Sequence, residues 1–186
     1  MADDHVDTVR ALQLILQQVE VGIDGVANLL QTAAHSGREQ PERMAVFAET
    51  RHLLRVVAGS LRAVRVDVRA EIAEELVAHA RKREILLVLV NLIQNAAQAI
   101  VRSGEGGGGV LLAGRQDGNR CVLEVSDWAG GVPADAADRI FDPGYTTGDG
   151  TGLGLYLSRK LVQANGGTLT YHPLDGGSCF RINLPS

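Results

Sequence analysis

The chain has 186 residues, and its 45% hydrophobic content is enough for one large or two small domains with a hydrophobic core. Its 18 basic and 22 acidic residues give a net charge of −4, which argues against nucleic acid as a partner. The two cysteines stand alone in alternating apolar segments, a pattern that predicts buried strand thiols rather than a metal cluster or a disulfide framework.

The longest apolar run, residues 85–100, is interrupted by carboxamide side chains and is shorter than the roughly 20 residues that span a bilayer. The N-terminus lacks the basic start and the apolar stretch of a signal peptide. We therefore expect no membrane segment in this chain and a cytoplasmic location.

The first part of the chain is expected to be a helical hairpin. Apolar residues recur at helical spacing over 4–34, which predicts a long amphipathic helix. Ser36-Gly37 should end it, and Pro41 suits the first turn of a second helix. Two such helices cannot bury their apolar faces alone, so we expect a homodimer built on a four-helix bundle. The predicted domains are a dimerisation hairpin over 1–63 and a second domain over 64–186.

The apolar pattern of the second domain alternates strands with helices. A strand is expected to start at Val64, and whether it continues through 70–76 or gives way to a helix stays open. A helix is expected over 81–102, followed by a glycine-rich loop over 103–109. The remaining expected elements are strands over 110–113, 120–126, 168–172 and 179–184 and a helix over 153–165. This order predicts an α+β sandwich with helices on one face of a mixed or antiparallel sheet.

A polar stripe runs along the helix expected over 81–102. Asn91, Asn95 and Gln98 are spaced at i, i+4 and i+7, so their amides share one face of a helix that is otherwise apolar. Such a stripe could be a ligand-binding face, and the alternative interpretation is a plain solvated face. The stripe alone does not decide between them.

Segment 124–133 places an acidic residue at the end of an apolar strand, with small residues directly after it. The carboxylate of Asp127 could accept a hydrogen bond from an exocyclic amine, and Gly130 and Gly131 would let the backbone approach a flat ring. The alternative interpretation is an ordinary aspartate turn.

Segment 148–155 is rich in glycine and leads into the helix expected over 153–165. Glycines at a helix start leave backbone N–H groups unpaired at the positive end of the helix dipole, which is a common way to hold phosphate oxygens. The preceding segment, 141–147, could be a hinged lid that is anchored through Phe141. Many glycine loops bind nothing, so neither segment is decisive alone.

Taken in chain order, these four segments resemble, in order and spacing, the N, G1, F and G2 boxes of the GHKL nucleotide-binding superfamily, whose histidine kinases are the closest branch. The resemblance covers about two thirds of the chain and includes segment 176–185, which is similar to the final strand of those kinase domains. It implies an α/β sandwich of the histidine-kinase type that binds ATP and Mg²⁺.

The resemblance also implies roles for single residues. Asn95 would coordinate the metal with Asn91 beside it as a catalytic residue, and Asp127 would receive the adenine amine. Gly131 would pack under the base, and residues of segment 148–155 would face the phosphates. The candidate nucleotide-binding residues are Asn95, Asp127, Gly131, Thr146, Thr147, Thr151, Gly152, Leu153 and Gly154.

Three positions depart from the pattern of the family. Ala129 stands where the G1 box usually has its first glycine, and Gly144 stands where a second aromatic is common. Gly148 stands where a lysine often reaches the phosphates. Loss of that lysine removes one charge-assisted contact, so a lower affinity or a lower rate is expected.

Asn91 separates the branches of the superfamily by its chemistry. Members that hydrolyse ATP to drive large conformational cycles carry a glutamate at this position, which can activate water as a general base. Asparagine cannot take a proton, so ATP would survive until a better nucleophile such as an imidazole arrives. This favours phosphoryl transfer over a gyrase-like or chaperone-like machine.

A phosphoacceptor histidine followed by an acidic residue does not occur in the sequence. His5 is the candidate acceptor because it lies in the first expected helix, although Val6 takes the place of the acid. His35, His52 and His79 fit this role less well.

Two classes of function therefore stay open. In the first, a dimeric histidine kinase uses Mg-ATP to phosphorylate a histidine and passes the group to an aspartate on the receiver domain of a response regulator. In the second, a degenerate kinase fold is a phosphotransfer or regulatory scaffold. A serine kinase that acts on another protein is a third alternative, because the same domain serves that chemistry in related families.

Overall fold

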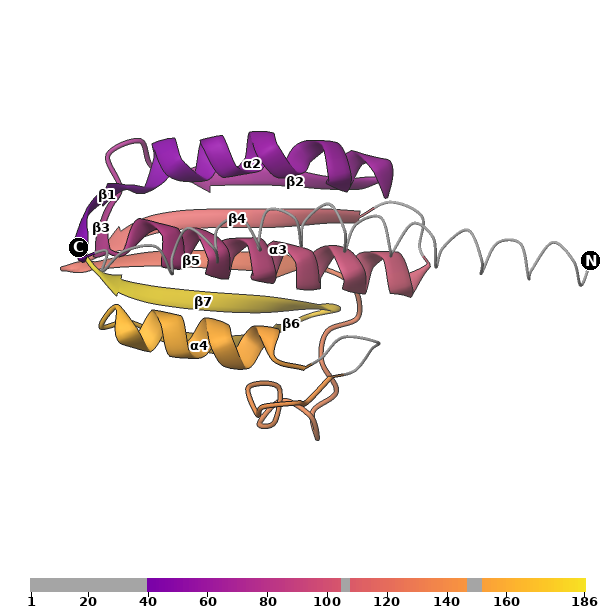
Figure 1. Ribbon diagram of the computed structural model, residues 1–186. Helices are drawn as coiled ribbons and strands as arrows, with labels where there is room; N and C mark the ends of the chain where they lie inside the picture. Colours follow the sequence, from indigo (N-terminus) through magenta and orange to yellow (C-terminus); the bar gives the residue numbers. More distant parts are fainter. Residues whose placement is uncertain (1–39, 105–107, 147–151) are drawn as a thin grey trace, which may run out of the picture.

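The computed structural model describes residues 40–104, 108–146 and 152–186 (Figure 1). In these ranges the chain forms two layers, a β-sheet and a layer of three helices that covers one of its faces. The α+β sandwich that the sequence predicts is confirmed for this part of the chain.

The main sheet has five strands in the order β2-β4-β5-β7-β6. β2 pairs with β4 in parallel, and the other neighbours are antiparallel, so the sheet is mixed. β4 and β5 form a hairpin in which Asp117 lies opposite Arg120, and Gly118 takes a φ of 58° in the turn. The strands are β2 (Val66–Ile72), β4 (Gly108–Asp117), β5 (Arg120–Asp127), β6 (Thr168–Leu174) and β7 (Gly177–Pro185).

The helices are α2 (Val46–Ala63), α3 (Lys82–Ser103) and α4 (Gly154–Ala164). α3 lies between the other two and also contacts β4 and β5 (Figure 1). Leu89 and Leu92 of α3 are fully buried and join Leu123 and Ile182 of the sheet in one hydrophobic core. Because strand side chains alternate, Leu123 and Val125 face the helices, and the residue between them faces the other side of the sheet.

α3 is the helix of the described residues that is long and apolar enough to cross a membrane by length and composition. Its apolar side chains pack between the sheet and the two neighbouring helices, where Ile85, Leu89 and Leu92 have no exposed surface. A helix covered on several sides needs apolar residues around most of its circumference, which accounts for this composition.

The start of the second hairpin helix differs from the prediction. The residues after Pro41 form a short strand, β1 (Glu42–Ala45), which pairs antiparallel with β3 (Val77–Ala80). α2 begins only at Val46, whose N–H donates to the carbonyl oxygen of Leu76 at 3.0 Å. The partner of β1 is distant in the sequence, so local periodicity does not reveal this pairing.

α2 packs its buried residues Leu53, Val57 and Leu61 against β2 and α3. These side chains belong to the core of the sandwich, so the expected boundary between residues 63 and 64 does not separate two cores in the described part of the chain. The first expected helix, over 4–34, lies outside the described residues. The hairpin and its dimer therefore stay predictions.

Several local predictions can be compared with the structure. The open segment 70–76 continues as strand to Ile72 and then turns into β3. The loop expected over 103–109 is shorter, because α3 runs to Ser103 and β4 starts at Gly108. Both cysteines are buried free thiols in strands, as predicted, and burial raises the pKa of Cys121 to about 12.

Candidate nucleotide-binding site

The carboxamide of Asn91 lies where α3 meets α4. Asn91 and Asn95 are half-buried, and Gln94 between them is buried. The Nδ2 of Asn91 donates a hydrogen bond to Oγ of Ser158 on α4 at 2.9 Å. Asn91 thus lies in a contact between helices, while Asn95 lies one turn further along the same face.

Asp127 ends β5 on the face of the sheet that carries the helices. Its side chain is only 3% exposed, and Oδ1 accepts a hydrogen bond from the backbone N–H of Ala129 at 3.1 Å. Burial raises the pKa of this carboxyl, and the bond from Ala129 only partly opposes the effect. Within the described residues no salt bridge involves Asp127. The carboxylate therefore keeps acceptor positions that a ligand can fill.

The glycines after Asp127 bring two backbone segments into close contact. Gly130 and Gly131 have φ values of 87° and 74°, and the N–H of Gly130 donates to the carbonyl oxygen of Gly176 at 2.9 Å. A Cβ at Gly131 would lie 2.8 Å from the carbonyl oxygen of Gly177, and a Cβ at Gly177 would overlap the carbonyl of Asp127. Only glycine fits at either position, so the two backbone segments pack directly against each other beside the carboxylate.

Tyr171 on β6 contacts the end of this turn. Its hydroxyl accepts a hydrogen bond from the N–H of Val132 at 3.2 Å. The Tyr171 ring also lies 5.5 Å from the ring of Phe180 on β7, measured between centroids. The same tyrosine thus contacts the sheet and the turn that follows Asp127.

The segment between the glycine turn and α4 is anchored through aromatic contacts, as expected for Phe141. Its ring meets Phe180 edge-on at 6.3 Å, and the guanidinium of Arg159 on α4 lies 4.9 Å from the Phe141 ring centroid. Figure 1 shows this segment at the same end of the sandwich as the end of β5 and the start of α4. The anchor therefore connects the candidate lid to both β7 and α4.

Gly152 joins the base of the candidate lid to the start of α4. Its carbonyl oxygen accepts a hydrogen bond from the N–H of Gly144 at 3.1 Å, and its φ is 68°. A Cβ at Gly152 would lie 2.6 Å from the carbonyl oxygen of Tyr145, so a larger residue would displace the lid base. Gly144 itself has a φ of 81°, which suits glycine better than the aromatic residue common in the family.

The first turn of α4 offers the features of an anion site. Leu153 precedes the helix without a side-chain capping bond, and the first turn of α4 carries no acidic residue. The N–H groups and the positive end of the helix dipole are therefore not neutralised from within α4. A Cβ at Gly154 would lie 2.5 Å from Oδ1 of Asn91, so this glycine lets α4 start directly against the carboxamide of Asn91 on α3.

The structure brings the predicted residues together in two contacts, Asn91 with Gly154 and Asp127 with the glycine turn. Thr146 is exposed at the end of the lid base, and Leu153 is 43% exposed. The predicted site residues His5, Thr147 and Thr151 lie outside the described residues, as do the discussed positions His35 and Gly148, so their assignments stay predictions.

Sequence reasoning missed several residues that shape this site. A serine on the apolar face of α4 was a signal that could have identified Ser158, because a buried hydroxyl needs a partner. No comparable signal existed for Tyr171 or for the steric role of Gly177, since both depend on which strands become neighbours. The contacts of Phe180 and Arg159 with Phe141 also could not be predicted, because they depend on the fold.

Residues 80–186 match the family described as histidine kinase-, DNA gyrase B-, and HSP90-like ATPases. The chain belongs to this family. Its ATP-binding domain is a GHKL-type histidine kinase core, because the similar proteins and structures come from the histidine-kinase branch. The resemblance carried by the four sequence segments is confirmed at this level.

Two relatives show the extent of the likeness. The sensor protein kinase PilS of Pseudomonas aeruginosa is 44% identical over 100 residues, which are 52% of this chain and 19% of that protein. The signal transduction histidine-protein kinase AtoS of Escherichia coli is 31% identical over 179 residues, which are 94% of this chain and 28% of that protein. The chain thus spans less than a third of either relative.

A solved structure of this branch has the same fold. The nucleotide-free catalytic domain of the histidine kinase ThkA superposes with a TM-score of 0.71 at 25% sequence identity. The match covers 78% of this chain and 95% of that domain. The ATP-binding GHKL domain is therefore present nearly in full.

Proposed function

We propose that this chain is the core of a histidine protein kinase that binds Mg-ATP and transfers the γ-phosphoryl group to a histidine. The group would then pass to an aspartate on the receiver domain of a response regulator. One observation carries the proposal: Asp127, a buried carboxylate without a cationic partner in the described residues, ends β5 at the end of the sandwich where α4 starts against the carboxamide of Asn91. Membership in the family supports ATP as the nucleotide.

Asp127 would recognise the base. An ionised carboxylate accepts hydrogen bonds, so it suits the exocyclic amine of adenine and repels the carbonyl oxygen that guanine has at the same position. Gly131 would pack under the base, beside its close contact with the backbone of Gly177. The burial that raises the pKa of Asp127 also strengthens a hydrogen bond made there.

Asn95 would hold Mg²⁺ together with phosphate oxygens. Its amide oxygen is the hard ligand that Mg²⁺ prefers, and this ion commonly uses one or two protein ligands plus phosphates and waters. The described residues contain no cluster of three or more His, Cys, Asp or Glu side chains that could hold a metal alone. The donor set therefore fits a metal that arrives with the nucleotide, where it would neutralise phosphate charge.

Asn91 would leave water unactivated while the nucleotide is bound. Its side chain cannot accept a proton, and its amide nitrogen is already committed to Ser158. In the transfer step the bond between the γ-phosphorus and the β–γ bridging oxygen breaks, and a bond to an imidazole nitrogen forms. ADP leaves with the bridging oxygen, and the imidazole releases its proton to solvent. The chain's own part is to position these groups and to exclude a competing base.

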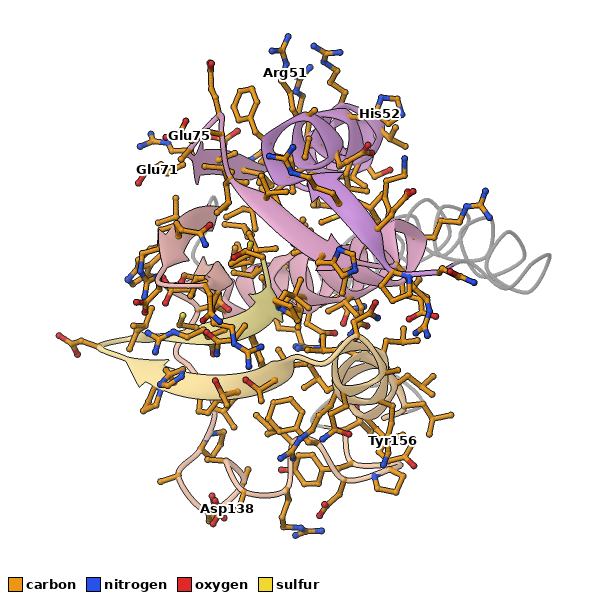
Figure 2. All side chains as sticks on the ribbon, turned by 90° about the vertical axis from the view of Figure 1, so that its left-hand side faces the viewer. Arg51, His52, Glu71, Glu75, Asp138 and Tyr156 are labelled. Atoms are coloured by element: carbon orange, nitrogen blue, oxygen red, sulfur yellow. The ribbon has the colours of Figure 1, made fainter. Side chains whose placement is uncertain are left out.

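The phosphoacceptor is proposed to be His5 or a histidine on a partner chain. His52 lies on the outer side of α2, at the opposite end of Figure 2 from Asp138, which precedes the candidate lid, and from Tyr156 on α4. His172 lies on β6, where its Nε2 and the hydroxyl of Thr170 are 3.0 Å apart. A homodimer that forms through the segment before residue 40 would bring an acceptor histidine to the site. A cytoplasmic location is proposed as well, because it would give the kinase access to a soluble receiver domain.

The binding step is tested with Asn95→Ala. This variant should lose the magnesium-dependent part of ATP affinity, because the amide oxygen that completes the metal site is gone. Isothermal titration with ATP, in Mg²⁺ and in EDTA, measures the difference. Asn183→Ala is the matched control, since it deletes the same group near the far end of β7. An unchanged ATP titration for Asn95→Ala would remove the central assignment.

The transfer step is tested with γ-labelled ATP on the full chain, with and without an added receiver-domain protein. A label that survives alkali and is lost in acid indicates phosphohistidine, and the opposite behaviour would indicate phosphoserine and a serine kinase. A chain that binds ATP but takes up and transfers no label would favour the regulatory scaffold instead.

A further inference from the structure

α4 places one hydroxyl group in the interior of the protein. Its buried side chains are Ser158 and Val162, and Ser158 is only 3% exposed. A hydroxyl in such a position costs free energy unless it is hydrogen-bonded. An apolar residue of similar size would be the default for packing alone, so the serine calls for a specific partner.

That partner is a carboxamide of the candidate site. The Nδ2 of Asn91 donates to Oγ of Ser158 at 2.9 Å, which connects α3 to α4 across 67 positions of the sequence. This bond uses the amide nitrogen of Asn91. Its oxygen, Oδ1, lies toward the first residue of α4, since a Cβ on Gly154 would be 2.5 Å from that oxygen. The serine on one side and the glycine on the other therefore set the position of the amide.

We infer that Ser158 is a positioning residue that fixes the orientation of the Asn91 amide, an inference that rests on the proposed function of Asn91. An asparagine amide that rotates by half a turn exchanges its donor for its acceptor. With the nitrogen bonded to Ser158, Asn91 presents an acceptor at the end of α4 where phosphates and metal-bound water would lie. Without the serine, the amide is free to turn its NH₂ group toward that end instead.

The inference predicts an effect of Ser158 that acts through Asn91. Ser158→Ala should weaken ATP binding about fivefold, which corresponds to a hydrogen bond of about 1 kcal/mol. The substitution leaves the helix intact, because alanine has the higher helix propensity. In an Asn91→Ala background the same substitution should have no further effect on ATP binding. A serine that matters only for packing would give the same loss in both backgrounds.

The experiment combines this double-mutant cycle with NMR on the nucleotide-free full chain. ATP affinity is measured by titration for the wild type, Ser158→Ala, Asn91→Ala and the double variant. The side-chain amide signals of Asn91, assigned by their loss in Asn91→Asp, should shift in Ser158→Ala. Ser103→Ala is the matched control, because its hydroxyl bonds only the carbonyl oxygen of Ile100 within α3. It should leave those signals and the ATP affinity unchanged.

Two results would overturn the inference. One is an Asn91 amide pair that does not move in Ser158→Ala, and the other is an equal loss of ATP affinity in both backgrounds. A wild-type chain that binds no ATP would contradict the proposed function instead, and the NMR arm would still decide whether Ser158 fixes the amide.

Discussion

Two carboxylates on the same strand have opposite surroundings. Glu124 points away from the helices, where Nε of Arg181 lies 2.6 Å and a guanidinium nitrogen of Arg115 lies 3.2 Å from its oxygens. Arg181 is its direct cross-strand neighbour on β7. Asp127 ends the strand on the helix side, where it is nearly inaccessible and bonds a backbone N–H.

The pKa values of the two groups move in opposite directions. Burial alone would raise the pKa of Glu124, but the hydrogen bond from Arg181 and the charges of Arg115 and Arg181 outweigh it and lower the pKa. For Asp127 burial dominates, and the pKa is raised. A paired carboxylate stabilises the fold, whereas one kept buried without a cation costs stability. The comparison supports the proposal that Asp127 binds a ligand.

The largest expected effect is the loss of ATP affinity when the charge of Asp127 is removed. Asp127→Asn should weaken ATP binding roughly 10- to 100-fold, because a charge-assisted hydrogen bond to the base is lost. It should also reduce the preference for ATP over GTP, since the amide can donate to the carbonyl oxygen of guanine. Titration with both nucleotides measures the two effects.

The same variant should raise the melting temperature of the nucleotide-free protein by a few degrees, since a buried charge is removed. A gain in stability together with a loss of binding is the signature of a group kept for function. A loss of stability in Asp127→Asn would break the comparison, because Asp127 would then be a structural residue like Glu124.

A smaller effect is expected for Glu124 on the other face of the sheet, where a substitution should lower stability and leave ATP binding unchanged. Glu124→Gln should lower the free energy of unfolding by about 1 kcal/mol, since it removes the charge between two arginines that are partly exposed and screened by solvent. ATP affinity should stay as in the wild type. Urea denaturation and ATP titration on the same preparation measure both quantities. A clear loss of ATP affinity would show that the outer face of the sheet acts on the site.

These two faces also show what the sequence could predict. Strong periodicity and glycine punctuation predicted α3, α4 and all strands of the main sheet, because these signals are local. β1 and the place of α2 in the sandwich were not predicted, since they depend on pairing with β3 and packing on β2. Apolar periodicity alone does not tell which surface a helix packs against.

The candidate site divides in the same way. Asn95, Asp127 and the glycines could be proposed from sequence because their residue types and spacing carry the chemistry. The bond between Asn91 and Ser158, the contact of Tyr171 with Val132 and the two arginines beside Glu124 could not, because each joins segments that only the fold brings together. Local chemistry is therefore readable from the sequence, and the contacts that orient it are not.

The smallest expected effect, and the sharpest form of the comparison, is in the pH dependence. The raised pKa of Asp127 means that its protonated form is favoured by folding, so its penalty is present at neutral pH and disappears as the pH falls through the folded-state pKa toward the ordinary value of about 3.9. The lowered pKa of Glu124 means that its stabilising contribution is complete above its ordinary value of about 4.3 and is lost only below it.

Unfolding free energies measured by urea denaturation from pH 7 downwards should therefore behave differently for the two variants. The stability advantage of Asp127→Asn over the wild type should shrink as the pH approaches about 4, while the deficit of Glu124→Gln stays constant over the same range. The difference from the wild type cancels the titration of all other groups, so each curve reports one carboxyl. Parallel curves for the two variants would mean that both carboxylates are held by the same kind of interaction. Such a result would contradict the proposal that Asp127 differs from Glu124 in being available to bind adenine.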